Sequence, residues 1–262
     1  MRNKKIQLGS MEISLLAGLE HDNKTTFTFE GAFSKLSTKR QVVRNVLSRL
    51  NRKGRINRIR KGLYMLVPFK SQTWSQTELS LVPLLAKGGY VSFWSALSFW
   101  SLTEQLPKTV YVATGFSQKQ REFEAVSFKF VHLASRYLFG EIEVKINGIA
   151  VKMASKEKAI LDCLLHPEYC GGIGEPAKAI KDNWEDLNWH KIKRFLKNMG
   201  NSAVERRLSY ILDYFNLIGP RRVLGKKKFA GFRLLDPTKG NSGGLDKDFG
   251  LRINLDLSSE IL

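Results

Sequence analysis

The chain has 262 residues, with 43 Lys or Arg against 24 Asp or Glu, and a formal net charge of +19. This length can bury a sizeable core and predicts two domains, because a domain usually spans about 100–200 residues. Two cysteines are too few for a disulfide framework, no apolar run approaches the length of a bilayer span, and no signal peptide is evident. We therefore predict an intracellular, cytoplasmic protein that does not bind membranes.

The positive charge is concentrated near the N-terminus. Residues 1–70 hold 16 Lys or Arg against 4 Asp or Glu, a net charge of +12, whereas the remaining residues carry 27 against 20, a net charge of +7. A strongly basic segment of this kind is typical of proteins that bind polyanions. We therefore predict that the binding function lies in the N-terminal part, which begins with a loose arm, MRNKKIQLGS.

Three short elements precede the most basic stretch. Residues 11–19 have apolar residues at helical spacing, residues 24–29 (KTTFTF) favour an extended strand, and residues 30–36 predict a second helix. Ser37 or Thr38 then supplies a hydroxyl that could cap a third helix.

The stretch from Lys39 to Lys61 contains ten Lys or Arg and no Asp or Glu. The apolar residues of its first half fall on one helical stripe, formed by Val42, Val43, Val46, Leu47 and Leu50. Gly54 suits the left-handed conformation that ends helices, and residues 55–66 predict two short strands that turn at Lys61-Gly62. Ile56 and Ile59 are three residues apart, which predicts a bulge or an early turn between them. Three helices followed by a basic hairpin indicate a winged-helix domain, whose third helix enters the major groove of DNA.

The other side of this predicted third helix presents polar side chains that can contact base edges and phosphates. We expect Gln41, Arg44 and Asn45 to read bases of a double-stranded operator, which we expect to contain inverted repeats. The other predicted DNA contacts are Thr38, Lys39, Arg40, Ser48, Arg52, Arg58, Arg60 and Lys61. The alternative is a solvated charged helix, but such surfaces usually mix both signs of charge.

A boundary at residues 67–73 divides the predicted domains, which we assign to residues 1–70 and 75–262. In the second domain we expect a helix at 79–86, a strand end at Tyr90, and a helix to residue 102 that Ser92 caps. Further strands are predicted at 109–114, 126–133, 142–146, 149–153, 229–235 and 249–257, and further helices at 156–165, 174–184, 188–199 and 202–217.

Local signals support this second domain. Asn147-Gly148 indicates a hairpin, Ser155 a helix cap, and Arg221-Arg222 a basic turn. Trp94, Phe99 and Trp100 could stack on bases, but aromatic residues at helical spacing are more often part of a core. The predicted fold class is α+β, with an N-terminal winged helix-turn-helix domain and a larger mixed α/β domain whose sheet is covered by helices.

A nuclease is the alternative function from a different class. Glu141, Glu143 and Lys145 alternate on a strand, as half of a metal-dependent nuclease site would, and Glu122 or Glu124 would have to supply the upstream acidic ligand. The other interpretation is that these charges face solvent while Ile142, Val144 and Ile146 point inward. We favour the solvated hairpin and predict no enzymatic activity.

Three further clusters could carry chemistry. Cys163, His166 and Cys170 have a spacing that zinc accepts, but His190 is the only nearby fourth ligand. The glycines Gly171, Gly172 and Gly174 lack the lysine of a phosphate-binding loop and predict a tight turn instead. The charged residues Glu157, Lys158 and Asp162 predict local ion pairs. We therefore predict no catalytic residues, no metal and no cofactor.

Several sequence blocks resemble the AbiEi antitoxins of type IV toxin–antitoxin, or abortive infection, systems. They are GRINRIRKGLYML (54–66), YVSFWSALSFWSLTEQLPKTVYVAT (90–114), ASKEKAILDCLLHPEYCGGIGE (154–175), NSAVERRLSYILDYF (201–215) and LDP (235–237). Together these blocks span most of the chain, but the N-terminal arm and residues 115–135 carry no motif of the family.

The resemblance implies an N-terminal winged-helix DNA-binding domain and an α/β C-terminal domain. It also implies a transcriptional repressor that regulates its own operon and counteracts a nucleotidyltransferase-like toxin without forming a stable complex with it. Two other functions stay open from the residues alone: a generic winged-helix transcription factor, and a protein that binds RNA.

Overall fold

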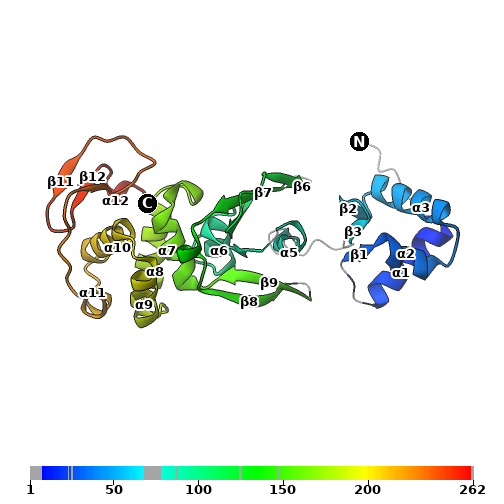
Figure 1. Ribbon diagram of the computed structural model, residues 1–262, viewed down its shortest axis with the longest axis horizontal. Coiled ribbons are helices and arrows are strands. Elements are labelled where there is room, and N and C mark those ends of the chain that lie inside the picture. The colour runs from blue at the N-terminus through cyan, green and yellow to red at the C-terminus, as the bar shows by residue number, and fades with distance from the viewer. Residues whose placement is uncertain are drawn as a thin grey trace. The chain divides into compact units, whose positions relative to one another are not determined.

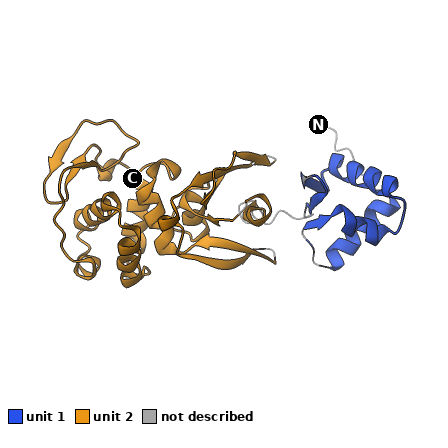
Figure 2. Ribbon diagram, in the orientation of Figure 1, with its two compact units in different colours: residues 1–74 blue, residues 75–262 orange. Residues whose placement is uncertain are grey.

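A computed structural model describes residues 8–22, 24, 26–67, 78–86, 88–123, 126–146 and 148–260. The chain is a mixed α+β protein with two compact units, residues 1–74 and 75–262 (Figure 2). Five sequence predictions lie outside the described residues, wholly or in part: the N-terminal arm, the strand at 24–29, the boundary at 67–73, Glu124 and Asn147.

Unit 1 combines three helices with a small sheet (Figure 1). Its elements are α1 (Ser10–His21), β1 (Thr26–Thr28), α2 (Phe29–Leu36), α3 (Arg40–Arg52), β2 (Ile56–Arg60) and β3 (Leu63–Leu66). The three strands pair antiparallel in the order β1-β3-β2. The predicted helices at 11–19 and 30–36 and the strand at 24–29 are therefore confirmed within a few residues.

The apolar stripe of α3 forms much of the core of unit 1. Val43, Val46, Leu47 and Leu50 are buried, and Val42 is half-buried. They pack with Leu15, Leu16 and Leu19 of α1 and with residues of α2, β1 and β2. Because this stripe is fixed against α1 and α2, the opposite side of α3 faces solvent.

The two ends of α3 differ in how well the sequence predicted them. The expected cap at Ser37 or Thr38 is wrong, since Lys39 is the N-cap residue and makes no side-chain capping bond. Ser37 instead ends α2 in the left-handed conformation, at φ 44°, and its hydroxyl donates to the Ser34 carbonyl. At the other end Gly54 has φ 64°, as expected for a glycine that follows a helix.

The predicted basic hairpin is present. β2 and β3 pair antiparallel and turn at Lys61-Gly62, and the register shifts between Arg58 and Arg60, where the predicted bulge lies. The Asn51 side chain at the end of α3 accepts a hydrogen bond from the backbone N–H of Arg58 at 3.2 Å. This bond connects the helix to the hairpin.

Unit 2 is built on a six-stranded mixed sheet in the order β6-β7-β5-β4-β9-β8. The strands are β4 (Tyr90–Val91), β5 (Thr109–Thr114), β6 (Arg121–Phe123), β7 (Val126–His132), β8 (Glu141–Ile146) and β9 (Ile149–Ala154). β5 and β7 are parallel, as are β4 and β9, while β8 and β9 form the predicted antiparallel hairpin. The short edge strand β6 was not predicted from the sequence.

The helices of unit 2 are α5 (Val82–Leu85), α6 (Phe93–Phe99), α7 (Lys156–Leu165), α8 (Gly174–Asn183), α9 (Trp189–Met199), α10 (Ser202–Tyr214), α11 (Ile218–Leu224) and α12 (Leu257–Glu260). Short 3-10 helices cover Ser135–Tyr137 and Pro167–Tyr169. As predicted, the Ser155 hydroxyl caps α7 by accepting from the Lys158 N–H. Leu161, Ile160 and Leu164 of α7 are completely buried, so this helix lies at the centre of the unit.

Unit 2 ends in a second small sheet, in which β12 (Leu251–Ile253) lies between β10 (Arg233–Leu234) and β11 (Gly244–Asp246). The predicted strands at 229–235 and 249–257 are thus shorter than expected, and Leu257 already begins α12. The predicted turn at Arg221-Arg222 is wrong, because both residues are helical in α11.

Two helix predictions in unit 2 also need correction. The helix expected at 79–86 is reduced to α5, which has Pro83 in its first turn. Ser92 occupies the N-cap position of α6 but makes no capping bond, because its hydroxyl donates to the Asp162 carboxylate at 2.6 Å.

Trp94, Phe99 and Trp100 are half-buried, and the Trp100 indole N–H donates to the Ala154 carbonyl at 2.8 Å. None of the helices in the described ranges has the length and hydrophobicity needed to cross a bilayer.

Candidate nucleic-acid interface

The exposed face of α3 carries the side chains that the sequence predicted to read bases. Gln41, Arg44, Asn45, Ser48 and Arg52 are all exposed, opposite the buried stripe of the same helix. Their exposure follows from the helical repeat, since residues three and four apart share a face. The structure therefore brings these five predicted residues together on one surface.

Three of these side chains form a chain of hydrogen bonds on the surface of α3. The Arg44 guanidinium donates to the Gln41 amide oxygen at 3.4 Å, and the Gln41 amide nitrogen donates to the Asn45 amide oxygen at 3.3 Å. These bonds are long and exposed, so a ligand can replace them at little energetic cost. The same groups can donate to and accept from base edges.

Arg40, at the first turn of α3, is held by α2. Its guanidinium donates to both carboxylate oxygens of Glu30, at 3.2 and 2.5 Å, and lies about 5 Å from the ring centroids of Phe29 and Phe33. Arg40 is exposed like its neighbour Lys39, whereas Thr38 is half-buried. Arg40 is therefore fixed in position, but part of its charge is neutralised by Glu30.

Two further cations, in the last turn of α3 and at its C-cap, pair with a buried acid that was not predicted from the sequence. The Glu12 side chain is 1% exposed and accepts from Arg49 at 2.9 Å, from Lys53 at 2.6 Å and from the Gly9 N–H at 2.9 Å. Burial acts to raise the pKa of Glu12, but these hydrogen bonds outweigh it and lower the pKa to about 2. Through their ion pairs with Glu12, Arg49 and Lys53 stabilise the packing of α3 against α1.

The hairpin adds further cations beside α3. Arg58 and Lys61 are exposed, on β2 and on the turn that follows it, and the backbone of Arg60 ends β2. Among the described residues, no acidic side chain lies within ion-pair distance of Lys39, Arg44, Arg52, Arg58 or Lys61. These five residues, together with Gln41, Asn45 and Ser48, are called the basic face of unit 1 below.

The acidic cluster considered as a nuclease site lies on β8 in unit 2. Glu143 and Lys145 are exposed, and Glu141 is half-buried and lies 3.9 Å from Lys152. The expected inward orientation holds for Ile146, which is buried, but Ile142 is 42% exposed. Within the part of the chain that the structure describes, no three His, Cys, Asp or Glu side chains gather in a group that could hold a metal ion.

The two cysteines of unit 2 are buried thiols. Burial raises the pKa of Cys163 well above its usual value, and the Cys170 thiol points at backbone carbonyls, including that of Pro167 at 3.4 Å. Gly171 and Gly172 form the predicted tight turn, with φ values of 79° and 109°. A Cβ atom on Gly172 would lie 2.8 Å from the Asp236 carboxylate, which accepts a hydrogen bond from the Ile173 N–H.

The predicted local ion pairs of α7 are only partly present. Lys158 pairs with Asp162, and both side chains are completely buried. Asp162 also accepts from the hydroxyls of Ser92 and Tyr90, which satisfies its second oxygen. Glu157 instead pairs with Lys191 of α9 at 2.7 Å. Because these groups satisfy one another inside the unit, their arrangement fits a structural network.

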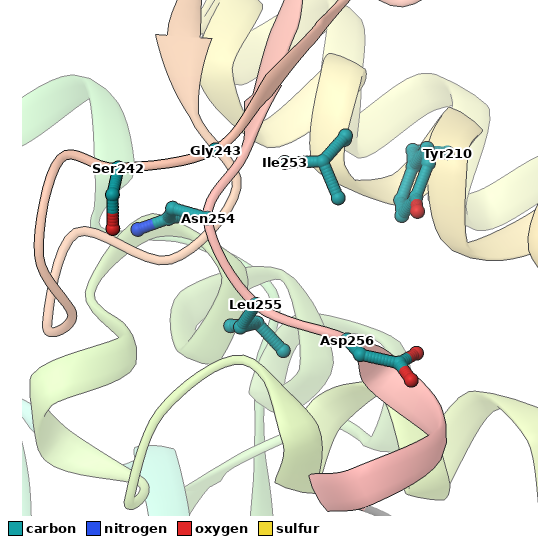
Figure 3. Close-up of a pocket in the computed structure, with 7 residues that line it drawn as sticks. All are labelled: Tyr210, Ser242, Gly243, Ile253, Asn254, Leu255 and Asp256. Atoms are coloured by element: carbon teal, nitrogen blue, oxygen red, sulfur yellow. The ribbon is translucent and has the colours of Figure 1, made fainter.

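Two of the cavities in the described part of unit 2 are of a size that could hold a small ligand. The first, of about 590 Å³, is lined by Tyr210 of α10, Ser242, Gly243, and residues 253–256 at the end of β12 (Figure 3). Its one carboxylate, Asp256, already accepts from the Tyr214 hydroxyl and from Ser258. The second cavity, of about 440 Å³, lies between α9, α10 and α11 and has several basic side chains in its lining.

No protein family matches this sequence, and no curated protein matches it either. The fold, however, is similar to that in the crystal structure of the RV2827C protein from Mycobacterium tuberculosis, with a TM-score of 0.67. The two chains share 13% sequence identity, and the similarity covers 94% of this chain and 92% of the other. At this level of identity the comparison shows a shared fold only.

Proposed function

We propose that unit 1 is a winged-helix domain that binds duplex DNA, and that the protein is a DNA-binding transcriptional regulator. The observation that carries the proposal is the basic face of unit 1, where base-reading side chains of α3 lie beside cations of the hairpin without an acid among them. The order α1, α2, α3, hairpin is the order of winged-helix domains, in which the third helix enters the major groove.

We further propose that the regulator is the antitoxin of a type IV toxin–antitoxin pair. This part of the proposal rests on the sequence blocks that resemble AbiEi antitoxins. In this proposal unit 1 represses the shared operon, and unit 2 counteracts a nucleotidyltransferase-like toxin without a stable complex. A generic transcription factor would need only the first of these activities.

The DNA-binding proposal can be tested with full-length protein and the DNA upstream of its own reading frame. Affinity should fall steeply with salt, with a log–log slope of roughly −4 to −7, because each phosphate contact releases counterions and contributes about −0.9. Lys24→Ala is the matched control within unit 1, since Lys24 pairs with Asp22 outside α3 and the hairpin. A slope near zero, or tighter binding to structured RNA at the same salt, would contradict the proposal.

The nuclease alternative is separated by a second assay. If Glu141 and Glu143 bind Mg²⁺, the purified protein should nick plasmid DNA in a metal-dependent manner, and Glu143→Gln should abolish the nicking. We expect intact plasmid in every condition, because Glu143 is exposed on the hairpin and Glu141 is half-buried and lies 3.9 Å from Lys152.

A further inference from the structure

The cavity between α9, α10 and α11 differs from the rest of unit 2 in its charge. Its volume is about 440 Å³, which lies in the range of small-molecule sites. Lys193, Arg194 and Lys197 reach it from one side of α9, and Lys227 reaches it from the segment that follows α11. His190 extends the same helical face, because residues 190, 193, 194 and 197 follow the helical repeat.

The floor of this cavity is apolar. Leu196 of α9 is 6% exposed, and Leu224, the last residue of α11, is half-buried. The cavity therefore combines a surface on which a planar ring can lie with a rim of cations. This combination fits a ligand with a ring at one end and negative charge at the other.

Several of the rim cations are already oriented by the protein. The Lys193 ammonium donates to the Val223 carbonyl at 2.7 Å, which connects α9 to α11, and the Arg194 guanidinium lies 5.9 Å from the Phe195 ring centroid. The Lys227 ammonium donates to the Glu205 carboxylate of α10 at 2.7 Å, which ties the segment after α11 to the cavity. The orientation of Lys193 and Arg194 lowers the entropy cost of binding an anion, whereas Lys227 must exchange Glu205 for the anion.

We propose that this cavity binds a phosphorylated small ligand of the nucleotide class. Its phosphate groups would lie against Arg194, Lys197 and Lys227, and its base would lie on Leu196 and Leu224. Lysine and arginine are the usual ligands of phosphate, and arginine binds it in a bidentate manner. All residues that line the cavity belong to unit 2, so this inference does not depend on DNA binding by unit 1.

Glu205 provides a test that separates ligand binding from a purely structural role of these cations. Its side chain is 14% exposed, and it is the one carboxylate among the described residues that line the cavity. When a phosphate binds, this carboxylate repels it and competes for Lys227. Removal of its charge should therefore strengthen binding, although it removes an ion pair.

Binding should be measured by calorimetry on the full-length protein at fixed salt, with ATP, adenosine and inorganic tripolyphosphate as probes. We expect ATP to bind more tightly than tripolyphosphate, because only ATP also covers the apolar floor, and adenosine to bind most weakly. The double variant Arg194→Ala/Lys197→Ala should weaken ATP binding by about tenfold or more through lost charge-assisted hydrogen bonds. Both side chains are exposed, so the fold should be unaffected.

Three control variants complete the experiment. Glu205→Gln should tighten ATP binding several-fold. Lys247→Ala removes an exposed lysine outside the cavity, and Arg44→Ala/Arg52→Ala removes two cations of the basic face; both should leave ATP affinity within about twofold of the wild type.

Four results would overturn the proposal. They are no binding of ATP at all, equal binding of ATP and adenosine, unchanged ATP affinity in Arg194→Ala/Lys197→Ala, and weaker ATP binding in Glu205→Gln. A single-stranded oligonucleotide is the last probe. If it binds through Arg194 and Lys197 while ATP does not, the cavity belongs to a nucleic-acid surface and the small-ligand assignment is wrong.

Discussion

At the scale of single residues, Glu12 explains why cations in one short stretch have different roles. Arg49 and Lys53 belong to the same acid-free stretch as Arg44 and Arg52, yet both donate to Glu12. Glu12 precedes Arg49 by 37 positions, so no local pattern in the stretch reveals the pairing. The sequence could thus predict that the third helix is basic, but not which of its cations remain available to a ligand.

We expect Glu12→Gln to destabilise unit 1 by about 1–3 kcal/mol at neutral pH, because a buried amide replaces a carboxylate that accepts three hydrogen bonds. The pKa of Glu12 is lowered from about 4.5 to about 2, so its stabilising effect is present above the unfolded pKa. It is lost as the pH falls from about 5 to about 2. Denaturant unfolding of both proteins across this range measures the effect. A stability difference that does not shrink at acid pH would contradict this role.

Arg44 and Asn45 allow the second prediction at this scale. If they read bases, Arg44→Ala or Asn45→Ala should cost about 1–3 kcal/mol on the specific operator and much less on random DNA. Neither side chain contacts an acid in the described residues, so stability should hardly change. Fluorescence anisotropy on both DNAs, with Lys24→Ala as control, gives the two affinities. Equal losses on both DNAs would mean that these residues contact phosphates.

At the scale of elements, local signals predicted α3 and the hairpin well. The stripe of Val42, Val43 and Val46 specifies which side of the helix is buried, Gly54 has the backbone conformation that ends it, and Lys61-Gly62 forms the turn. The cap failed because Ser37 adopts a left-handed conformation to end α2, which leaves Lys39 at the start of α3. Only three residues separate α2 from α3, so the same Ser or Thr could either end the first helix or cap the second.

The end of unit 2 was predicted less well, because its elements depend on distant contacts. Arg206 of α10 donates to the carbonyls of Ala230, Gly231 and Gly250, and thereby holds the segment before β10 and the residue before β12. The strands β10, β11 and β12 are only two or three residues long. Segments this short carry too little periodic pattern for a sequence-based assignment.

The hairpin gives a prediction that differs from that for α3. Arg58→Ala and Lys61→Ala should weaken binding to all DNA sequences about equally, since cations beside a helix that lies in the groove contact the phosphate backbone. Each variant should make the salt slope less steep by about one, because one fewer counterion is released. Salt titrations of the two variants, on operator and random DNA, measure this change. A loss confined to the operator would place these side chains on bases.

At the scale of the whole molecule, each unit has its own hydrophobic core, so we expect each to fold independently. Unit 1 has a core formed by α1, α2, α3 and its sheet, and unit 2 has a core centred on α7 and the six-stranded sheet. The two units also differ in charge, because residues 39–61, which contain no Asp or Glu, belong to unit 1. The sequence predicted both the number of parts and the concentration of charge in the first, because these follow from length and composition.

If the units also divide the work, variants in each should lose different activities. If the proposed antitoxin role holds, Arg44→Ala should derepress the operon yet still protect cells that co-express the proposed toxin, because unit 2 is unchanged. Leu161→Asp should abolish protection, because α7 buries Leu161 completely and an unpaired charge there unfolds unit 2. The same protein should still bind operator DNA through unit 1. Survival, promoter activity and protein level are scored in the same cells, with Lys24→Ala as control.

The result that would refute the division of labour is specific. If Arg44→Ala and Arg58→Ala both lose protection at wild-type protein levels, protection is a consequence of repression, and unit 2 has no separate activity against the toxin. Loss of operator binding in Leu161→Asp would instead show that unit 1 needs a folded unit 2. Because the buried core residues described in unit 1 all come from that unit, between Leu15 and Met65, we expect operator binding to survive in Leu161→Asp.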